Sequence, residues 1–208
     1  MYVAVAGNIG VGKSSLTHIL SERYRLQPIY EAVDENPYLP DFYSDMPRWA
    51  FHSQMFFLAE RLRQHLRQVN PGERVIQDRT VYEDAAVFAR ALWRDRLMDD
   101  RDHDSYRRMY EAIAATLRPP DLLIYLRASL PTLRSRIALR GRDYESTIDS
   151  RYLARLNELY DAFVRDYALS RVVVVPADEL DFVGSEDDQR DIFTLLEPYG
   201  LVPPLVRG

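Results

Sequence analysis

The stretch VAVAGNIGVGKSS, residues 3–15, decides the fold of this chain. It matches the phosphate-binding pattern GxxxxGK(S/T) completely, between a predicted buried strand and a predicted helix, which is the context that the motif requires. The glycines let backbone N–H groups converge on phosphate oxygens, and the helix N-terminus adds partial positive charge. We therefore predict an ATP site formed by Gly7, Asn8, Ile9, Gly10, Val11, Gly12, Lys13, Ser14 and Ser15.

Lys13 and Ser14 have distinct expected tasks within this loop. The lysine ammonium reaches the β- and γ-phosphates, and the serine hydroxyl holds Mg²⁺. We therefore expect Mg²⁺ as the cofactor, bound together with ATP as the phosphate donor. The loop alone leaves the acceptor of the phosphate open among water, a protein, a nucleotide and a smaller molecule.

Short apolar runs alternate with long helical segments along the chain, a pattern typical of α/β proteins with a parallel sheet. We expect a single domain over residues 1–208, with the three-layer α/β/α fold of P-loop NTPases and a five-stranded parallel sheet. The predicted strands are 2–6, 28–31, 74–78, 122–126 and 171–175. The predicted helices are 13–24, 47–69, 81–97, 104–117, 130–139, 149–168 and 186–197.

The composition is that of an ordinary globular chain, and it argues against several kinds of partner and site. The net charge of −5 argues against a nucleic-acid polymer as partner, because such proteins carry a basic surface. The chain has no cysteine, which excludes a disulfide, a thiolate nucleophile and a cysteine-ligated metal. No apolar run approaches the roughly 18 residues of a membrane span, and the start lacks a signal-peptide pattern. We therefore expect a cytoplasmic protein without a membrane partner.

Charged residues follow two predicted strands at the edge of the sheet where ligands bind in open α/β folds. Glu31 ends strand 28–31, where a carboxylate could take the proton of an attacking hydroxyl. Asp78 and Arg79 end strand 74–78. An acid there can serve Mg²⁺ directly or through water, and an arginine can pair with a carboxylate or a phosphate.

The segment RIALRGRDYE, residues 136–145, gathers arginines around one glycine. Arginines in a closing loop can stabilise charge on a transferring phosphoryl group and keep water away from ATP. We therefore predict a lid at about residues 136–147 that contains Arg136, Arg140 and Arg142. The chain has no Asn-Lys-x-Asp run of the GTPase kind and no HRD or DFG string of a protein kinase.

Five segments together resemble the deoxyribonucleoside kinase family, which includes bacterial deoxyadenosine and deoxyguanosine kinases and is related to deoxycytidine kinase. The segments are GNIGVGKSS, YEAVDENPYL, FYSDMPRWAFHSQ, DRTVYEDAAVF and RIALRGRDYE. The resemblance covers essentially the whole chain. It implies an enzyme that moves the γ-phosphate of ATP to the 5′-hydroxyl of a deoxyribonucleoside and so gives the 5′-monophosphate for nucleotide salvage.

The resemblance also assigns roles near the reacting groups. Glu31 matches the family's general base, and Arg79 matches the arginine beside it that positions the hydroxyl and the base. Asp78 matches the acid of an acid-Arg-Ser motif, although this chain has Asp and Thr80 where many members have Glu and Ser. Arg136, Arg140 and Arg142 match the lid arginines, and Asp181 and Phe182 fall where the family contacts the adenine of ATP.

For the nucleoside, the resemblance implies a second set of contacts. Tyr43 matches the tyrosine that binds the sugar 3′-hydroxyl, and Glu145 matches its carboxylate partner. Gln54 matches the glutamine that reads the edge of the base. The residues expected to flank or stack on the base are Arg61, Asp84, Trp49 and Phe88.

Helical spacing supports this base pocket independently of the resemblance. Gln54 and Arg61 are seven residues apart, and Asp84 and Phe88 are four apart, so each pair shares a helix face. A carboxamide can pair with adenine or cytosine, and with guanine after it turns over. Asp84 can accept a hydrogen bond from an exocyclic amine, which thymine lacks. The residues favour amine-bearing bases. They leave open whether the base is a purine or a pyrimidine.

Two other functions stay open from the residues. A nucleoside monophosphate kinase, such as a thymidylate kinase relative, needs cations around its acceptor phosphate, where Glu31 has the wrong charge. A nucleotide-binding partner subunit of a heteromeric kinase would keep the loop without turnover, but Lys13, Ser14, Glu31 and Asp78 form a complete set. We further expect a homodimer, because helices 47–69 and 81–97 carry more apolar residues than one sheet face can cover.

Overall fold

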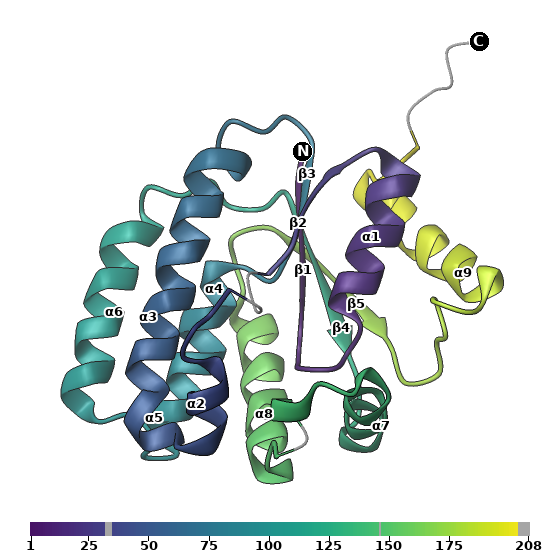
Figure 1. Cartoon of the computed structure of the whole chain (residues 1–208). Helices are drawn as coiled ribbons and strands as arrows, with labels where there is room; N and C mark the ends of the chain where they lie inside the picture. Colours follow the sequence, from purple (N-terminus) through teal and green to yellow (C-terminus); the bar gives the residue numbers. More distant parts are fainter. Residues whose placement is uncertain (32–34, 146, 204–208) are drawn as a thin grey trace.

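The computed structural model describes residues 1–31, 35–145 and 147–203. Within these residues, five parallel strands form one sheet in the order β2-β3-β1-β4-β5 (Figure 1). The strands are β1 (Tyr2–Gly7), β2 (Gln27–Ile29), β3 (Val75–Asp78), β4 (Leu122–Arg127) and β5 (Arg171–Pro176). The predicted α/β class and all five predicted strands are confirmed. Because β2 ends at Ile29, Glu31 lies in the loop after the strand.

The register of the central strands brings the phosphate-binding loop beside the end of β3. Val5 of β1 stands opposite Asp78 of β3, and Gly7 of β1 stands opposite Leu126 of β4. The carboxyl ends of these parallel strands therefore meet at one edge of the sheet, which is where ligands bind in such folds. This edge carries the site described below.

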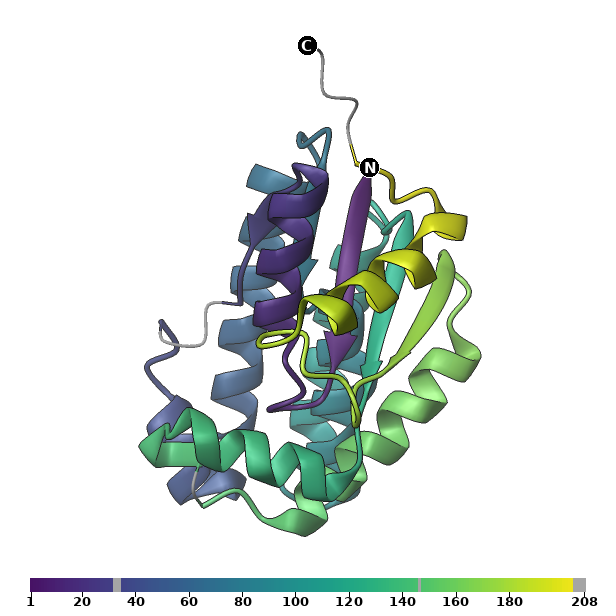
Figure 2. The ribbon, with the colours of Figure 1, turned by 90° about the vertical axis from the view of Figure 1, so that its right-hand side faces the viewer.

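Side chains of β1 alternate between two apolar cores, one on each face of the sheet. Tyr2, Ala4 and Ala6 belong to one core, and Val3 and Val5 belong to the other. Every residue of β1 is buried, which explains the continuous apolar run in the sequence. Figure 2 shows α1 and α9 against the second face, and α7 lying across the edge where β1 and β4 end.

The helices match most of the predicted ranges, but two long predicted helices contain π-helical stretches. The range 47–69 is α3 followed by η1, and the range 81–97 is α4, η2 and α5. A π-helical turn is rare and often occurs at functional sites. The helices are α1 (Lys13–Tyr24), α2 (Leu39–Ser44), α3 (Met46–Gln64), η1 (His65–Val69), α4 (Val81–Glu83), η2 (Asp84–Ala89), α5 (Arg90–Arg94), α6 (Asp100–Ala114), α7 (Leu130–Arg140), η3 (Asp143–Glu145), α8 (Ser150–Asp166), α9 (Glu186–Leu196) and η4 (Glu197–Tyr199).

Helix α6 adds a layer outside the sheet and its first helical covering. Its Tyr106 is buried in a third apolar cluster with Leu58 of α3 and with Val81 and Ala89 of the segment after β3 (Figure 1). Part of the apolar surface of the range 81–97 is therefore covered within the chain, whereas Trp93 of α5 is 36% exposed. None of the helices in the described ranges is long and apolar enough to span a bilayer.

Candidate active site

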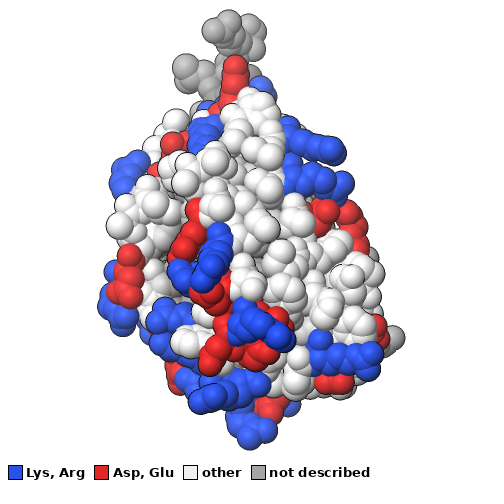
Figure 3. Space-filling view, turned by 90° about the vertical axis from the view of Figure 1, so that its left-hand side faces the viewer, with Lys and Arg blue, Asp and Glu red and all other residues white. Residues whose placement is uncertain are grey.

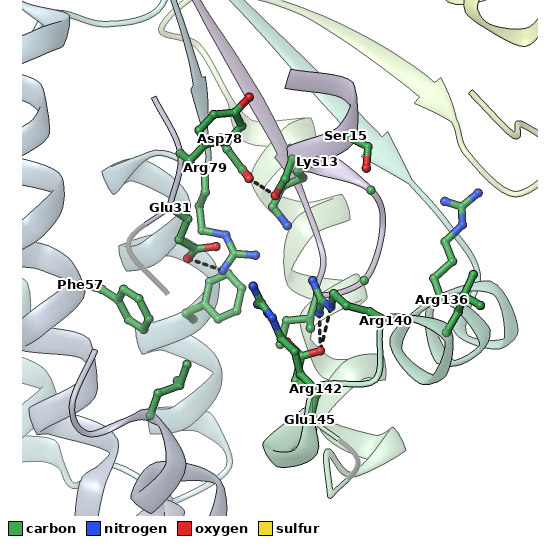
Figure 4. Close-up of a pocket in the computed structure, with 18 of the residues that line it drawn as sticks. Lys13, Ser15, Glu31, Phe57, Asp78, Arg79, Arg136, Arg140, Arg142 and Glu145 are labelled. Atoms are coloured by element: carbon green, nitrogen blue, oxygen red, sulfur yellow. Dashed lines mark hydrogen bonds and ion pairs between the residues drawn. The ribbon is translucent and has the colours of Figure 1, made fainter. Parts of the chain in front are cut away.

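A cavity of about 710 Å³ opens at the edge of the sheet where β1 and β3 end. Figure 4 shows charged side chains entering it from the phosphate-binding loop, from the loops after β2 and β3, and from the lid. Most of the predicted site residues line it. They are Ile9, Gly10, Gly12, Lys13, Ser14, Ser15, Glu31, Tyr43, Gln54, Asp78, Arg79, Asp84, Phe88, Arg136, Arg140, Arg142, Glu145, Asp181 and Phe182.

The phosphate-binding loop is shaped by its glycines and anchored from behind. Gly12 has φ 105°, and a Cβ there would lie 2.8 Å from the ring of Phe182, so only glycine fits. Asn8 is buried and donates hydrogen bonds to the Leu153 carbonyl and to Asn157 of α8, at 3.0 and 2.7 Å. Three predicted loop residues, Gly7, Asn8 and Val11, are not among the described residues that line the cavity. They support the loop instead.

Lys13 begins α1 and is held back against its own loop. Its Nζ donates a hydrogen bond to the Asn8 carbonyl at 3.0 Å, and the side chain is buried. Burial, together with the positive charge of Arg79, lowers the pKa of Lys13 to about 8. The charge of the ammonium group is thus not fully compensated by the protein. An anionic phosphate would supply the missing negative charge.

Ser14 and Asp78 form the predicted metal-binding pair. The Ser14 hydroxyl donates a hydrogen bond to Asp78 Oδ2 at 2.5 Å. The other oxygen, Oδ1, is buried and has no hydrogen-bond partner within the described part of the chain. A hydroxyl and a carboxylate are the hard oxygen ligands that Mg²⁺ prefers, usually alongside water and substrate phosphates. The residues present therefore fit a magnesium ion bound together with a nucleotide.

Glu31 receives two arginines on one oxygen. Arg79 Nη1 donates a hydrogen bond to Oε1 at 3.0 Å, and Arg61 Nη2 lies 3.1 Å from the same atom (Figure 4 shows the first contact). Burial alone would raise the pKa of Glu31, but the charges of Arg79, Arg61 and Lys13 outweigh it and hold the pKa below its ordinary value. Glu31 is therefore an ionised carboxylate at neutral pH.

Arg79 has an unusual backbone and several partners. Its φ of 65° lies in the left-handed region, which costs free energy for a residue other than glycine and persists only where the surroundings hold it. Its guanidinium lies 4.2 Å from the ring centroid of Phe88, and Nη2 donates to the Gly7 carbonyl at 3.4 Å. Arg79 thus connects Glu31, the end of β1 and an aromatic wall of the cavity.

Arg61 lies behind the cavity wall and does not face the ligand space. It is 2% exposed and stands outside the described lining residues. Its Nε donates to Asp84 Oδ2 at 3.1 Å, and its Nη1 donates to the Asp78 carbonyl at 3.3 Å. Burial raises the pKa of Asp84, while Arg61 and Arg79 oppose that rise. Arg61 therefore supports Glu31 and Asp84 from behind the cavity wall. It would not contact a bound nucleobase directly.

Gln54 and Trp49 have different places on α3. Gln54 lines the cavity, and its Oε1 is buried without a hydrogen-bond partner among residues 1–31, 35–145 and 147–203. Trp49 is not among the described lining residues and stacks on Tyr38, with ring centroids 5.7 Å apart. Five residues of an α-helix turn through about 140° beyond a full turn, which carries Trp49 away from the Gln54 face. The predicted stacking of Trp49 on the base therefore does not fit its position.

The lid arginines make contacts of two kinds. Arg140 donates two hydrogen bonds to Glu145 Oε2, at 2.9 and 2.6 Å, and Arg142 donates to Glu145 Oε1 at 3.5 Å. Figure 4 shows Arg142 reaching from the lid toward Glu31 and Arg79. Arg136 instead donates to the carbonyls of Val11, Ala177 and Leu180, at 2.8, 2.7 and 3.0 Å.

A tyrosine stack and an arginine–aromatic contact lie at opposite ends of the cavity. Tyr43 of α2 stacks on Tyr144 of the lid, with ring centroids 5.8 Å apart and planes at 16°. At the other end, the Arg136 guanidinium lies 5.9 Å from the ring centroid of Phe182. Asp181 precedes that ring, and its Oδ1 accepts a hydrogen bond from the Gly184 N–H at 3.1 Å. Tyr43 and Glu145 thus lie at the lid side, and Asp181 and Phe182 beside the phosphate-binding loop.

Several residues of the site were not predicted from the sequence. Phe57, three residues after Gln54, lines the cavity and carried a signal in its helical spacing. Glu83 does not line the cavity but contacts Arg79, and its place three residues after Thr80 matched a helix-capping pattern that could have marked it. Other lining residues without a distinctive signal are Tyr30, Leu39, Phe42, Ser53, Leu139, Tyr152, Leu180 and Val183.

Known proteins share the sequence pattern and the fold of this chain. The pattern of the deoxynucleoside kinase family matches residues 3–199. The chain is 34% identical over 192 residues to a deoxyadenosine/deoxycytidine kinase of Bacillus subtilis (strain 168), with 91% of this chain and 88% of that protein covered. It is 33% identical over 197 residues to a deoxyguanosine kinase of the same strain, with 90% and 91% covered. It also resembles a solved deoxyadenosine kinase from M. mycoides with the products dCMP and a flexible dCDP bound: the TM-score is 0.84 at 32% identity, over 95% of this chain and 100% of that one.

Proposed function

Since the chain belongs to the deoxynucleoside kinase family and phosphorylates deoxynucleosides, we propose that Glu31 takes the proton from the substrate's 5′-hydroxyl. The observation that carries this proposal is a carboxylate, 11% exposed, that lines the cavity and is kept ionised by Arg79 and Arg61. An ionised carboxylate can accept a proton at neutral pH, and it suits an uncharged hydroxyl better than an anionic phosphate as the attacking group.

The proposed reaction moves one proton to Glu31 and one phosphoryl group to the 5′-oxygen. The 5′-oxygen gives its proton to the Glu31 carboxylate and forms a bond to the γ-phosphorus with its electron pair. The bond between that phosphorus and its bridging oxygen breaks, and ADP leaves with the electrons. Lys13 and Arg142 offer positive charge to the phosphates, which stabilises the charge that spreads over the transferring group.

Mg²⁺ is proposed as the metal that accompanies ATP. Ser14 Oγ and the free Oδ1 of Asp78 would hold it, either directly or through water. When bound, the ion neutralises phosphate charge at the leaving group. The protein contributes the Ser14–Asp78 pair to this metal site. The hydrogen bond of the pair joins the start of α1 to the end of β3.

Amine-bearing bases are the proposed acceptors, with deoxyadenosine and deoxyguanosine first and deoxycytidine next. Gln54 offers an amide whose Oε1 has no partner in the described part of the protein, so it can accept from an exocyclic amine. Asp84 lines the same cavity and also accepts. Thymine offers no amine to either group. Phe88 and Phe57 provide the flat apolar walls for the base.

The lid and the loop 177–184 are proposed to hold the rest of the two substrates. Tyr43 and Glu145 lie on the lid side, where they can bind the sugar 3′-hydroxyl. Phe182 and Asp181 lie beside the loop glycine Gly12, where they can meet the adenine of ATP. The contacts of Arg140 and Arg142 with Glu145 would keep these two arginines within the cavity, where the phosphates are proposed to bind.

A cytoplasmic homodimer is proposed as the working form, because ATP is the donor and because one face carries uncharged surface. Figure 3 shows this surface as a band over the side of the molecule that α3 and α6 form, with charged side chains gathered beside and below it. Leu66, just beyond α3, and Met109 of α6 are 52% and 48% exposed. Sedimentation is expected to give a dimer at micromolar concentration, and a 24.3 kDa monomer would contradict it.

An acceptor panel tests the proposed substrate class. Deoxyadenosine, deoxyguanosine, deoxycytidine, thymidine and deoxyadenosine monophosphate are compared as acceptors with ATP and Mg²⁺, by following ADP release. We expect turnover with the three amine-bearing nucleosides, at least ~10-fold lower kcat/KM with thymidine, and none with the monophosphate. Activity on the monophosphate alone would contradict the proposal.

A further inference from the structure

Glu83 is a fully buried carboxyl group beside the site that no step above uses. Its exposed fraction is 0%, and it stands outside the described residues that line the cavity. It belongs to α4, the short helix directly after β3, and it immediately precedes Asp84. A carboxyl group is rarely buried without a task, because leaving water is costly for it unless it is paired or protonated.

One oxygen of Glu83 faces the turn that carries Arg79. Glu83 Oε1 accepts a hydrogen bond from the Thr80 N–H at 3.0 Å, and the same oxygen is 3.9 Å from Arg79 Nε. The backbone of Arg79 is in the left-handed region, so the contacts on either side of it must hold that conformation. Glu83 fastens the residue that follows Arg79 and therefore holds one end of this strained turn.

The guanidinium of Arg79 lies between two carboxyl groups. Its Nη1 bonds to Glu31, whereas its Nε, on the Glu83 side, has no hydrogen-bond partner among the residues described. Glu83 Oε2 is likewise buried and unpartnered in that set. The close pairing is thus with Glu31, and the Glu83 contact is the looser of the two. That asymmetry keeps the Arg79 charge on the side of the reacting groups.

Burial favours the neutral form of Glu83. Burial raises the pKa of Glu83 to about 8, with Asp84 adding to the rise and Arg79 and Lys13 opposing it. The buried cations Arg61 and Arg79 already pair with two other carboxylates, Glu31 and Asp84. Within the described part of the chain, other titratable groups that interact with Glu83 are the phenols of Tyr2, Tyr125, Tyr160 and Tyr167, from β1, β4, α8 and the residue after α8.

We propose that Glu83 is a positioning residue for phosphoryl transfer, which holds the Asp78–Arg79–Thr80 turn so that the Arg79 guanidinium faces Glu31 and the acceptor hydroxyl. A neutral carboxyl group accepts from the Thr80 N–H without competing with Glu31 for Arg79. An ionised Glu83 would attract the Nε edge of the guanidinium and weaken its bond to Glu31. The inference rests on the proposed roles of Glu31 and Arg79.

Two substitutions separate positioning from mere stability. Glu83→Gln keeps an oxygen for the Thr80 N–H and cannot ionise, whereas Glu83→Ala removes the contact. With ATP and deoxyadenosine saturating at pH 7, we expect Glu83→Gln to keep kcat within ~3-fold, and Glu83→Ala to lower kcat by ~30- to 100-fold with little change in the KM for ATP. Glu111→Ala on the exposed outer side of α6 is the matched control and is expected to leave both constants unchanged.

The pH profile gives a readout that a purely structural role would not change. Wild-type kcat is expected to fall above about pH 8 as Glu83 ionises, and Glu83→Gln is expected to keep its activity there. The Glu83 charge raises the pKa of Lys13, so its removal would make a Lys13-limited profile fall at lower pH, which is the opposite of the effect expected here. This comparison also decides the matter if Glu83→Ala fails to fold in circular dichroism.

Two results would overturn the inference. One is a Glu83→Ala protein that loses thermal stability but keeps the wild-type kcat per folded enzyme. The other is a Glu83→Gln profile that falls with pH as steeply as the wild-type profile. Failure of the proposed function has a different signature, because the wild-type enzyme itself would then phosphorylate none of the deoxynucleosides in the acceptor panel.

Discussion

Arg79 and Glu31 are joined by a hydrogen bond of 3.0 Å between Nη1 and Oε1 at the wall of the cavity, where their side chains are 8% and 11% exposed. The two residues come from loops after different strands, and the left-handed backbone of Arg79 is what aims its side chain across the gap. The bond keeps Glu31 ionised and also keeps it in place. A carboxylate fixed in this way can act on a hydroxyl group without first reorganising its surroundings.

Arg61 supports this arrangement from behind, so its loss should be costly for folding. Arg61→Met would leave Glu31 and Asp84 as buried carboxylates with one cation fewer. Breaking a buried ion pair from one side costs about 3–5 kcal/mol, so we expect a loss of that size in the free energy of unfolding measured in urea. Arg63→Met, two residues later and half exposed, is the control and should cost at most about 1 kcal/mol. Equal losses in the two variants would show that Arg61 has no bracing role.

Gln54 should affect the nucleoside and leave ATP alone. Gln54→Ala removes the amide that faces the base, and we expect kcat/KM for deoxyadenosine to fall by ~10- to 100-fold while the KM for ATP stays within ~2-fold. Steady-state kinetics with each substrate varied in turn measure both effects. His52→Ala, on the exposed side of the same helix, should change neither constant. A similar loss for ATP would place Gln54 outside the base site.

Lys13 should make the empty protein less stable at neutral pH, because its pKa of about 8 lies below the 10.5 of an exposed lysine. Between these values the unfolded chain holds a proton that the folded protein has released, so the contribution of Lys13 to stability rises with pH across this window. Below pH 8 its penalty is constant. Lys13→Met should therefore raise the free energy of unfolding at pH 7 by ~1–3 kcal/mol and abolish turnover.

Thermal unfolding as a function of pH, with and without ATP, measures this effect. The gap between wild type and Lys13→Met should narrow as the pH rises from 8 to 10.5. ATP should stabilise the wild type and leave the variant nearly unchanged, because the phosphates supply the charge that the buried ammonium lacks. A variant less stable than the wild type at pH 7 would contradict this account.

The sequence predicted the parts of this protein that depend on local patterns. The phosphate-binding loop and the apolar runs of β1 and β4 are continuous signals, and the structure has them where they were expected. The positions of Glu31, Asp78 and Arg79 followed from one rule about the edge of a parallel sheet. These residues meet because their strands are neighbours in the order that the sheet adopts.

Other features depend on packing that no local pattern records. The π-helical segment from Asp84 to Ala89 changes which side chains share a face, and its sequence reads as an ordinary helix. Arg61 and Gln54 have the spacing of one face, yet the arginine lies behind the cavity because Asp84 and Glu31 hold it there. Trp49 stacks on Tyr38 because its position on α3 directs it away from the face that carries Gln54. The family resemblance gave no information about this orientation.

The central claim is that Glu31 is the general base, and Glu31→Gln tests it most directly. The amide keeps nearly the same shape but cannot take a proton, so kcat with deoxyadenosine and saturating ATP should fall by ~10²- to 10⁴-fold while ATP binding is kept. Glu35→Gln, whose side chain is exposed and pairs only on the surface with Arg63 among the contacts described, controls for the substitution itself. A Glu31→Gln enzyme with near-wild-type kcat would contradict the account.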